Sequence, residues 1–193
     1  PQNSFIQSGL QEIDGLTKII QDMLLLARID SGLSALTFSK LYLDEIVLEV
    51  VAKLQKISAA KNIQIKFDIK ETSERQQILG EYDLLTNLFM NLIENAIKYS
   101  NSNTTVHVQV EWKNDVTVFR VQDFGPGISE EMKTHLFKRF SRGDTSSKSK
   151  GFGLGLAIAQ KIATLHETII ILDTTAASGC LFSVEFKNTA PES

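Results

Sequence analysis

At its centre the chain reads Asn91-Leu92-Ile93-Glu94-Asn95-Ala96-Ile97-Lys98-Tyr99-Ser100, in which polar and charged residues alternate with apolar ones. Two glycine-containing segments follow it, Asp123-Phe124-Gly125-Pro126-Gly127 and Gly151-Phe152-Gly153-Leu154-Gly155-Leu156. Each segment alone is a weak signal, because polar helix faces, turns and glycine runs are common. In this order they predict a nucleotide pocket made of a polar helix face, a carboxylate on a turn and a glycine-rich helix start.

The first segment lies on a helix that the apolar spacing predicts from Asp83 to Tyr99. At about 100° per residue, one face of that helix carries Asn87, Asn91, Glu94, Asn95 and Lys98. Solvated faces usually favour Glu, Lys and Arg, and asparagine is a poor helix former, so three asparagines indicate ligand binding. An amide oxygen is a suitable donor to Mg²⁺, and Lys98 is suited to phosphate charge.

Asp123 follows a predicted strand, and the two glycines after it permit a tight turn or a close backbone approach to a ligand. A carboxylate here accepts an exocyclic amine, although the segment alone is also that of an ordinary Asp-initiated turn. The glycines at 151, 153 and 155 precede a predicted helix, whose free amide groups suit phosphate oxygens. Protein Ser/Thr kinase and dinucleotide-binding patterns fail, because the motifs that accompany them are missing or out of order.

Composition limits the partners of the chain. Its 193 residues are 42% hydrophobic, enough for one domain with an appendage, and a net charge of -3 gives no basic field for nucleic acid. Apolar runs fall short of the roughly 20 residues of a membrane span, and no signal-peptide pattern starts the sequence, so we expect no membrane contact. The single Cys180 is predicted to be a buried thiol in a reducing cytosol.

Hydrophobic spacing predicts one long helix over residues 4 to 30, with a stripe wide enough for a bundle or a dimer rather than for its own domain alone. Beyond it, helices are predicted at Asp44–Ala60, Asp83–Tyr99 and Leu154–Leu165, and strands at Ile63–Ile69, Thr104–Trp112, Val116–Gln122, Thr168–Leu172 and Leu181–Phe186. This is an α+β fold, a two-layer α/β sandwich whose mixed sheet has helices on one face, preceded by one long bundle helix. The polar segment 141–150 predicts a mobile loop.

Together the motifs resemble the ATP-binding catalytic domain of sensor histidine kinases, within the gyrase, Hsp90, histidine kinase and MutL superfamily. Residues 91–99 are similar to the N box, 123–127 to the first glycine box, Phe137-Lys138-Arg139-Phe140 to the F box and 151–156 to the second glycine box. The resemblance covers nearly the whole chain. It implies that residues 1–33 are the second helix of a dimerisation and histidine-phosphotransfer bundle, and that residues 34–193 bind ATP.

The resemblance implies a protein-histidine kinase that uses ATP and Mg²⁺. Asn95 would coordinate Mg²⁺, Tyr99 would line the base or ribose, and Asp123 would accept the adenine amine. The groups expected at the phosphates are Asn91, Lys98 and, at the γ-phosphate, Arg142. The other expected nucleotide contacts are Gly125, Gly127, Ile128, Phe140, Gly151, Gly153, Leu154, Gly155 and Leu156. The loop at 141–150 would close as a lid.

The resemblance also implies a homodimer through the bundle, a response-regulator receiver domain as partner, and a cytoplasmic position within a membrane-anchored sensor. The phosphoacceptor helix is missing, so we expect the chain to be part of a larger receptor. His107, His135 and His166 lack the pattern of a phosphoacceptor, and we expect structural roles for them.

Two departures from the family concern nucleotide affinity: Phe152 replaces a small hydroxyl residue, and Cys180-Leu181 lacks the usual threonine. A degenerate regulatory module without kinase activity is therefore one alternative. A hydrolysing ATPase is another, but Asn91 stands where such relatives carry a glutamate base. Glu94, on the same face, is a weaker candidate for a catalytic group.

Overall fold

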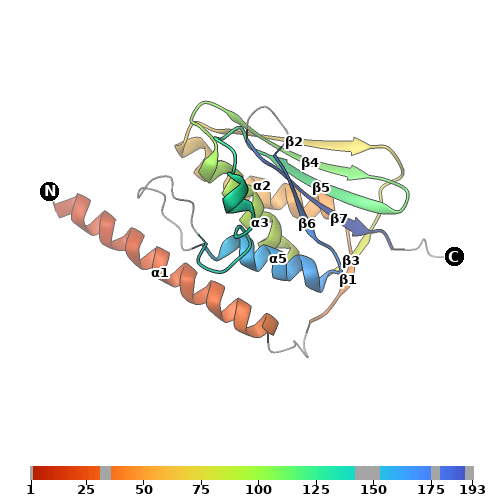
Figure 1. Cartoon of the computed structure of the whole chain (residues 1–193), viewed down its shortest axis with the longest axis horizontal. Coiled ribbons are helices and arrows are strands. Elements are labelled where there is room, and N and C mark those ends of the chain that lie inside the picture. Colours follow the sequence, from red (N-terminus) through yellow and green to blue (C-terminus); the bar gives the residue numbers. More distant parts are fainter. Residues whose placement is uncertain (1, 31–35, 142–152, 175–178, 190–193) are drawn as a thin grey trace.

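The computed structural model describes residues 2–30, 36–141, 153–174 and 179–189. In these ranges the elements are α1 Gln2–Asp30, β1 Ser39–Leu41, α2 Leu43–Ala60, β2 Gln64–Glu71, β3 Ile78–Gly80, α3 Tyr82–Tyr99, β4 Thr105–Trp112, β5 Val116–Gln122, α4 Glu130–Lys133, α5 Gly155–Leu165, β6 Ile170–Asp173 and β7 Leu181–Lys187. Figure 1 shows α2, α3 and α5 on one side of the main sheet, and α1 running past α5. The predicted α+β fold, with its one long leading helix, is confirmed.

The main sheet has the strand order β2-β4-β5-β7-β6. β2 and β4 are parallel, whereas the other neighbouring pairs are antiparallel, so the sheet is mixed as predicted. The predicted hairpin joins β4 and β5, and the Lys113 amide donates to the Val116 carbonyl across its turn. Sequence periodicity missed β1, β3 and α4 because each spans only three or four residues, too few to repeat a pattern.

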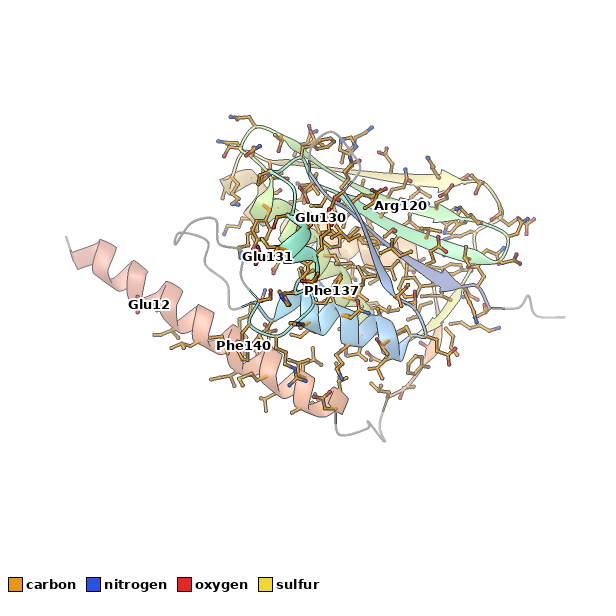
Figure 2. All side chains as sticks on the ribbon, in the orientation of Figure 1. Glu12, Arg120, Glu130, Glu131, Phe137 and Phe140 are labelled. Carbon is orange, nitrogen blue, oxygen red and sulfur yellow. The ribbon has the colours of Figure 1, made fainter. Side chains whose placement is uncertain are left out.

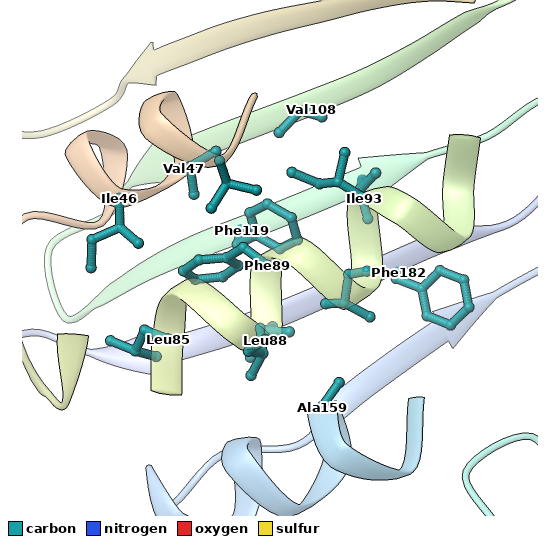
Figure 3. Close-up of a cluster of buried hydrophobic side chains, with 14 of the residues drawn as sticks. Ile46, Val47, Leu85, Leu88, Phe89, Ile93, Val108, Phe119, Ala159 and Phe182 are labelled. Atoms are coloured by element: carbon teal, nitrogen blue, oxygen red, sulfur yellow. The ribbon is translucent and has the colours of Figure 1, made fainter. Parts of the chain in front are cut away.

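The core lies between the sheet and its helices, because α3 and the strands each turn an apolar face inward. Phe89 of α3 packs against Phe119 of β5, with ring centroids 4.6 Å apart, and against Phe186 of β7 at 6.1 Å. Figure 3 shows Phe89 and Phe119 in the core, with Ile46 of α2 and Ala159 of α5 on either side of α3. Burial of each such side chain stabilises the fold by about 1.5–3 kcal/mol, which holds α3 firmly against the sheet.

The leading helix α1 enters this core near its C-terminal end. Leu26 and Ile29 are buried, whereas Ile13, Leu16 and Ile20 are each more than half exposed. The Asp30 carboxylate contacts two cations of the domain, Arg139 at 2.5 Å and Lys161 at 3.0 Å. These three apolar side chains of α1 are therefore mostly uncovered in this single chain. Of the helices within the described ranges, none combines the length and apolarity that crossing a bilayer requires.

Candidate nucleotide-binding site

A cleft of about 490 Å³ lies where α3, the turn after β5 and the start of α5 meet. Eleven of the residues predicted to contact nucleotide line it: Asn91, Asn95, Lys98, Tyr99, Asp123, Gly127, Ile128, Gly153, Leu154, Gly155 and Leu156. These residues come from three segments spread over positions 91 to 156 of the sequence. The fold therefore brings the three motifs together around one cavity.

Asn91 is held in a fixed orientation on the inner side of α3. It is 8% exposed, and its amide nitrogen donates to the side-chain oxygen of Asn87, one turn earlier, at 2.7 Å. Its own oxygen points to the start of α5, because a Cβ added to Gly155 would lie 2.6 Å from it. Glycine at 155 thus lets α5 begin directly beside the amide, which leaves helix-start N–H groups facing the same cavity.

Lys98 and Tyr99 form the end of α3 that borders the cleft. The Lys98 ammonium lies 4.9 Å from the centroid of the Tyr99 ring, a cation–π distance. Tyr99 remains 37% exposed, so its ring is available to a ligand. A cation and an aromatic surface at one end of the cleft suit the phosphates and the base of a nucleotide.

Asp123 is the buried carboxylate of the site and is only 3% exposed. One of its oxygens accepts hydrogen bonds from the Gly125 amide at 2.9 Å and from the Cys180 amide at 3.3 Å. Burial raises the pKa of Asp123, and the two amides act against that rise by favouring the charged form. No donor among the described residues pairs with the second oxygen, so it is available to an incoming amine.

Two glycines allow the backbone to close around Asp123. A Cβ on Gly125 would lie 2.3 Å from the Tyr99 carbonyl oxygen. A Cβ on Gly179 would lie 1.9 Å from the Asp123 carbonyl oxygen, and Gly179 has φ +83°. Sequence reasoning missed Gly179, although its place just before the final strand was a signal for a tight approach. Both glycines allow contacts that a side chain would block.

The leading helix also reaches the cleft, which the sequence did not predict. Gly15, Lys18 and Asp22 of α1 belong to its lining, and Lys18 pairs with Glu94 of α3 at 2.5 Å. Burial raises the pKa of Asp22, Lys18 lowers it, and Glu94 raises it further. Glu94, a weaker candidate for a catalytic group, is thus ion-paired with a lysine of α1.

Four of the predicted contacts are not placed on the lining. Gly125 is not part of the cleft lining, and its amide donates to the Asp123 carboxylate. The Phe140 side chain is 60% exposed, with φ at 62°, and Figure 2 shows it with Phe137 in the segment between α4 and α5. Arg142 and Gly151 lie outside the described residues, as do Phe152 and the predicted lid apart from Ser141.

Cys180 is a buried thiol, as predicted, one residue before β7. It is 4% exposed, and burial, with the Asp123 charge as a smaller cause, raises its pKa to about 11. His166 is bound within the fold: its Nε2 accepts the Glu81 amide at 3.1 Å, and burial lowers its pKa. These contacts support the structural role expected for His166.

Residues 80–190, more than half of the chain, match the family described as histidine kinase-, DNA gyrase B-, and HSP90-like ATPase. The circadian input-output histidine kinase CikA of Synechococcus elongatus is 29% identical over 185 residues, 95% of this chain and 24% of that protein. The sensor histidine kinase RppB of Synechocystis sp. is 31% identical over 172 residues, 88% and 37% of the two proteins. The chain thus spans less than two fifths of the length of either relative.

Full-length ShkA in complex with AMPPNP is similar in structure, with a TM-score of 0.82 and 22% identity. The match covers 99% of this chain and 40% of that one, so it includes both α1 and the sheet domain. At that identity the likeness concerns the fold alone.

Proposed function

This chain belongs to the histidine kinase-, DNA gyrase B-, and HSP90-like ATPase family, and we propose that it transfers the γ-phosphoryl group of Mg²⁺-ATP to a histidine. Its sequence and fold are those of the ATP-binding catalytic region of a sensor histidine kinase, and the family implies ATP binding. The observation that carries the proposal is the convergence of the three motifs on one cleft with a buried carboxylate.

In this proposal the residues of the cleft divide between the two ends of ATP. Asp123 accepts the exocyclic amine of adenine, and Tyr99 lies against the base or ribose. Lys98, the Asn91 amide and the helix-start N–H groups near Gly155 contact the phosphates. Arg142 would complete this set at the γ-phosphate.

The residues fit a magnesium ion that is carried mainly by the nucleotide. Asn95 offers an amide oxygen in the cleft, and the described residues contain no group of three His, Cys, Asp or Glu side chains suited to hold a metal alone. Mg²⁺ is commonly bound by one or two protein oxygens together with substrate phosphates. The ion would offset phosphate charge, while Asn95 would orient it.

Transfer is favoured over hydrolysis because Asn91 is not a base. An amide neither takes a proton from water nor carries a charge, whereas hydrolysing relatives place a glutamate there. The imidazole of a histidine is itself a nucleophile, so positioning and charge neutralisation are sufficient for a loose phosphoryl-transfer transition state. A hydrolysing ATPase would instead turn over ATP without a histidine substrate.

We also propose the organisation of the intact protein. Residues 1–33 would belong to a dimerisation and histidine-phosphotransfer bundle, and residues 34–193 would form the ATP-binding domain, on the cytoplasmic side of a membrane-anchored sensor. The uncovered apolar residues of α1 support pairing with a second copy in that bundle: Ile13, Leu16, Ile20, Met23 and Leu24. The phosphoryl group would then pass to an aspartate of a response-regulator receiver domain.

The test is calorimetric titration with a non-hydrolysable ATP analogue, with and without Mg²⁺. We expect Asn95→Ala to remove most of the gain in affinity that Mg²⁺ gives, whereas Asn114→Ala, on the hairpin turn outside the cleft, should match the wild type. Phosphotransfer is then measured to an added bundle that contains the acceptor histidine. A folded wild type that binds no ATP analogue would instead identify a degenerate regulatory module.

A further inference from the structure

We propose that Lys61 is a positioning residue for the nucleotide, which holds the last turn of α3 and with it Lys98 and Tyr99. This inference rests on the proposed function, because it assigns a role within the same cleft. Lys61 lines that cleft but is the residue that caps the C-terminal end of α2, and none of the three motifs includes it.

The backbone around Lys61 is fixed by the turn that ends α2. The Lys61 amide donates to the Ser58 carbonyl at 3.0 Å, and the Ile63 amide donates to the same carbonyl at 2.9 Å. Between them Asn62 takes φ 56°, and its carbonyl accepts the Asn103 amide at 2.9 Å. The Lys61 side chain therefore starts from a rigid point.

From that point the Lys61 side chain crosses to the end of α3. Its ammonium donates to the carbonyl of Lys98 at 2.7 Å and to that of Ile97 at 3.1 Å. These carbonyls are among the last four of the helix, which lack partners within it and carry its negative dipole end. Burial lowers the pKa of Lys61, and the neighbouring Lys98 adds to this effect.

The position of this turn matters because both of its last residues border the ligand. The Lys98 ammonium lies over the Tyr99 ring, and the Tyr99 carbonyl is packed against Gly125, which binds Asp123. Without Lys61, the carbonyls of Ile97 and Lys98 would lose the side-chain donor that binds both of them. Fraying would then displace the phosphate-binding cation.

The experiment is a double-mutant cycle between Lys61→Met and Lys98→Met, with affinity for a non-hydrolysable ATP analogue as the readout. We expect Lys61→Met alone to weaken binding roughly 3- to 10-fold, and Lys61→Arg to stay within about twofold of the wild type. In the Lys98→Met background, Lys61→Met should cost less than about twofold, because the two residues act as one unit. Adenosine, which lacks phosphates, should lose less affinity than the triphosphate.

Two controls separate positioning from other roles. Lys53→Met removes an exposed lysine of α2 that pairs with Glu49, and it should leave affinity unchanged. If Lys61→Met is too unstable to purify, Lys61→Gln, which keeps a donor NH₂ group without the charge, replaces it in the cycle.

Three results would overturn the proposal. An equal loss from Lys61→Met in both backgrounds would mean that Lys61 binds the ligand independently of Lys98. If the wild type binds the analogue and Lys61→Met binds it equally well, the role of Lys61 is rejected while the proposed function stands. A wild type that binds no nucleotide would reject the proposed function together with this inference.

Discussion

Asp123→Asn is the substitution that tests the cleft most directly, because it changes one atom of a buried group. The side-chain oxygen that accepts the Gly125 and Cys180 amides is retained as an amide oxygen. The other oxygen becomes an NH₂ donor, which would face the donor amine of adenine. The loop geometry is therefore kept, while the proposed hydrogen bond to the base is replaced by two donors that face each other.

The magnitude follows from the burial of Asp123. At 3% exposure its contact to an amine is shielded from water, so a charge-assisted hydrogen bond of about 1.5–3 kcal/mol is at stake. That range corresponds to a roughly 10- to 100-fold loss of ATP affinity. Inosine triphosphate carries a carbonyl in place of the amine and accepts the new donor. The preference for ATP over inosine triphosphate should shrink or invert.

Calorimetric titration of the wild type and Asp123→Asn with ATP and inosine triphosphate measures both effects. Asp68→Asn, on β2 and paired with Lys66, serves as a control outside the cleft. The folded pKa of Asp123 is raised, so its charge costs stability at neutral pH, and the variant should melt no lower than the wild type. The proposed contact between Asp123 and the adenine amine is refuted if the folded variant binds ATP within about twofold of the wild type, or loses both nucleotides equally.

Three further predictions concern the same site. Because burial raises the pKa of Asp123, ATP affinity of the wild type should begin to fall at a pH above the ordinary aspartate pKa; titrations across pH should show a smaller fall for Asp123→Asn. Gly155→Ala should weaken the ATP analogue at least roughly tenfold, since the new Cβ would lie 2.6 Å from the Asn91 oxygen, whereas Gly9→Ala, with nothing within 4 Å, should bind normally in the same assay. Cys180, with its pKa raised from 9.0 to about 11, should react with iodoacetamide at pH 8 roughly 100-fold more slowly in the folded protein than after unfolding; equal rates by mass spectrometry would contradict this.

Local spacing was sufficient to predict most of the elements. The helices α2, α3 and α5 and the five strands of the main sheet were predicted with boundaries within about two residues, because their apolar patterns repeat over several turns or pleats. The polar face of α3 was predicted for the same reason, since a helix fixes which side chains share a side. The short β1, β3 and α4 were missed because no pattern repeats within them.

The contacts that shape the cleft depended on packing between distant segments. Asp123, just after β5, is held by the amide of Cys180, 57 positions later and just before β7. Gly179 lets the backbone at these two strand ends approach closely. Lys61 reaches the end of α3 only because α2 packs beside it. No local pattern marks such pairs, because their distances are set by how helices and strands stack.

From the sequence alone, the types of the longer elements, the order of the three motifs and the chemistry that each motif offers could be predicted. Those properties follow from residue type and spacing along a helix or strand, which a short segment contains in full. Only the packed structure shows that Lys18 of α1 meets Glu94, that α1 lines the cleft, and which oxygen of Asp123 accepts the two amides. These properties depend on the packing of whole elements against one core, which involves every residue of that core at once.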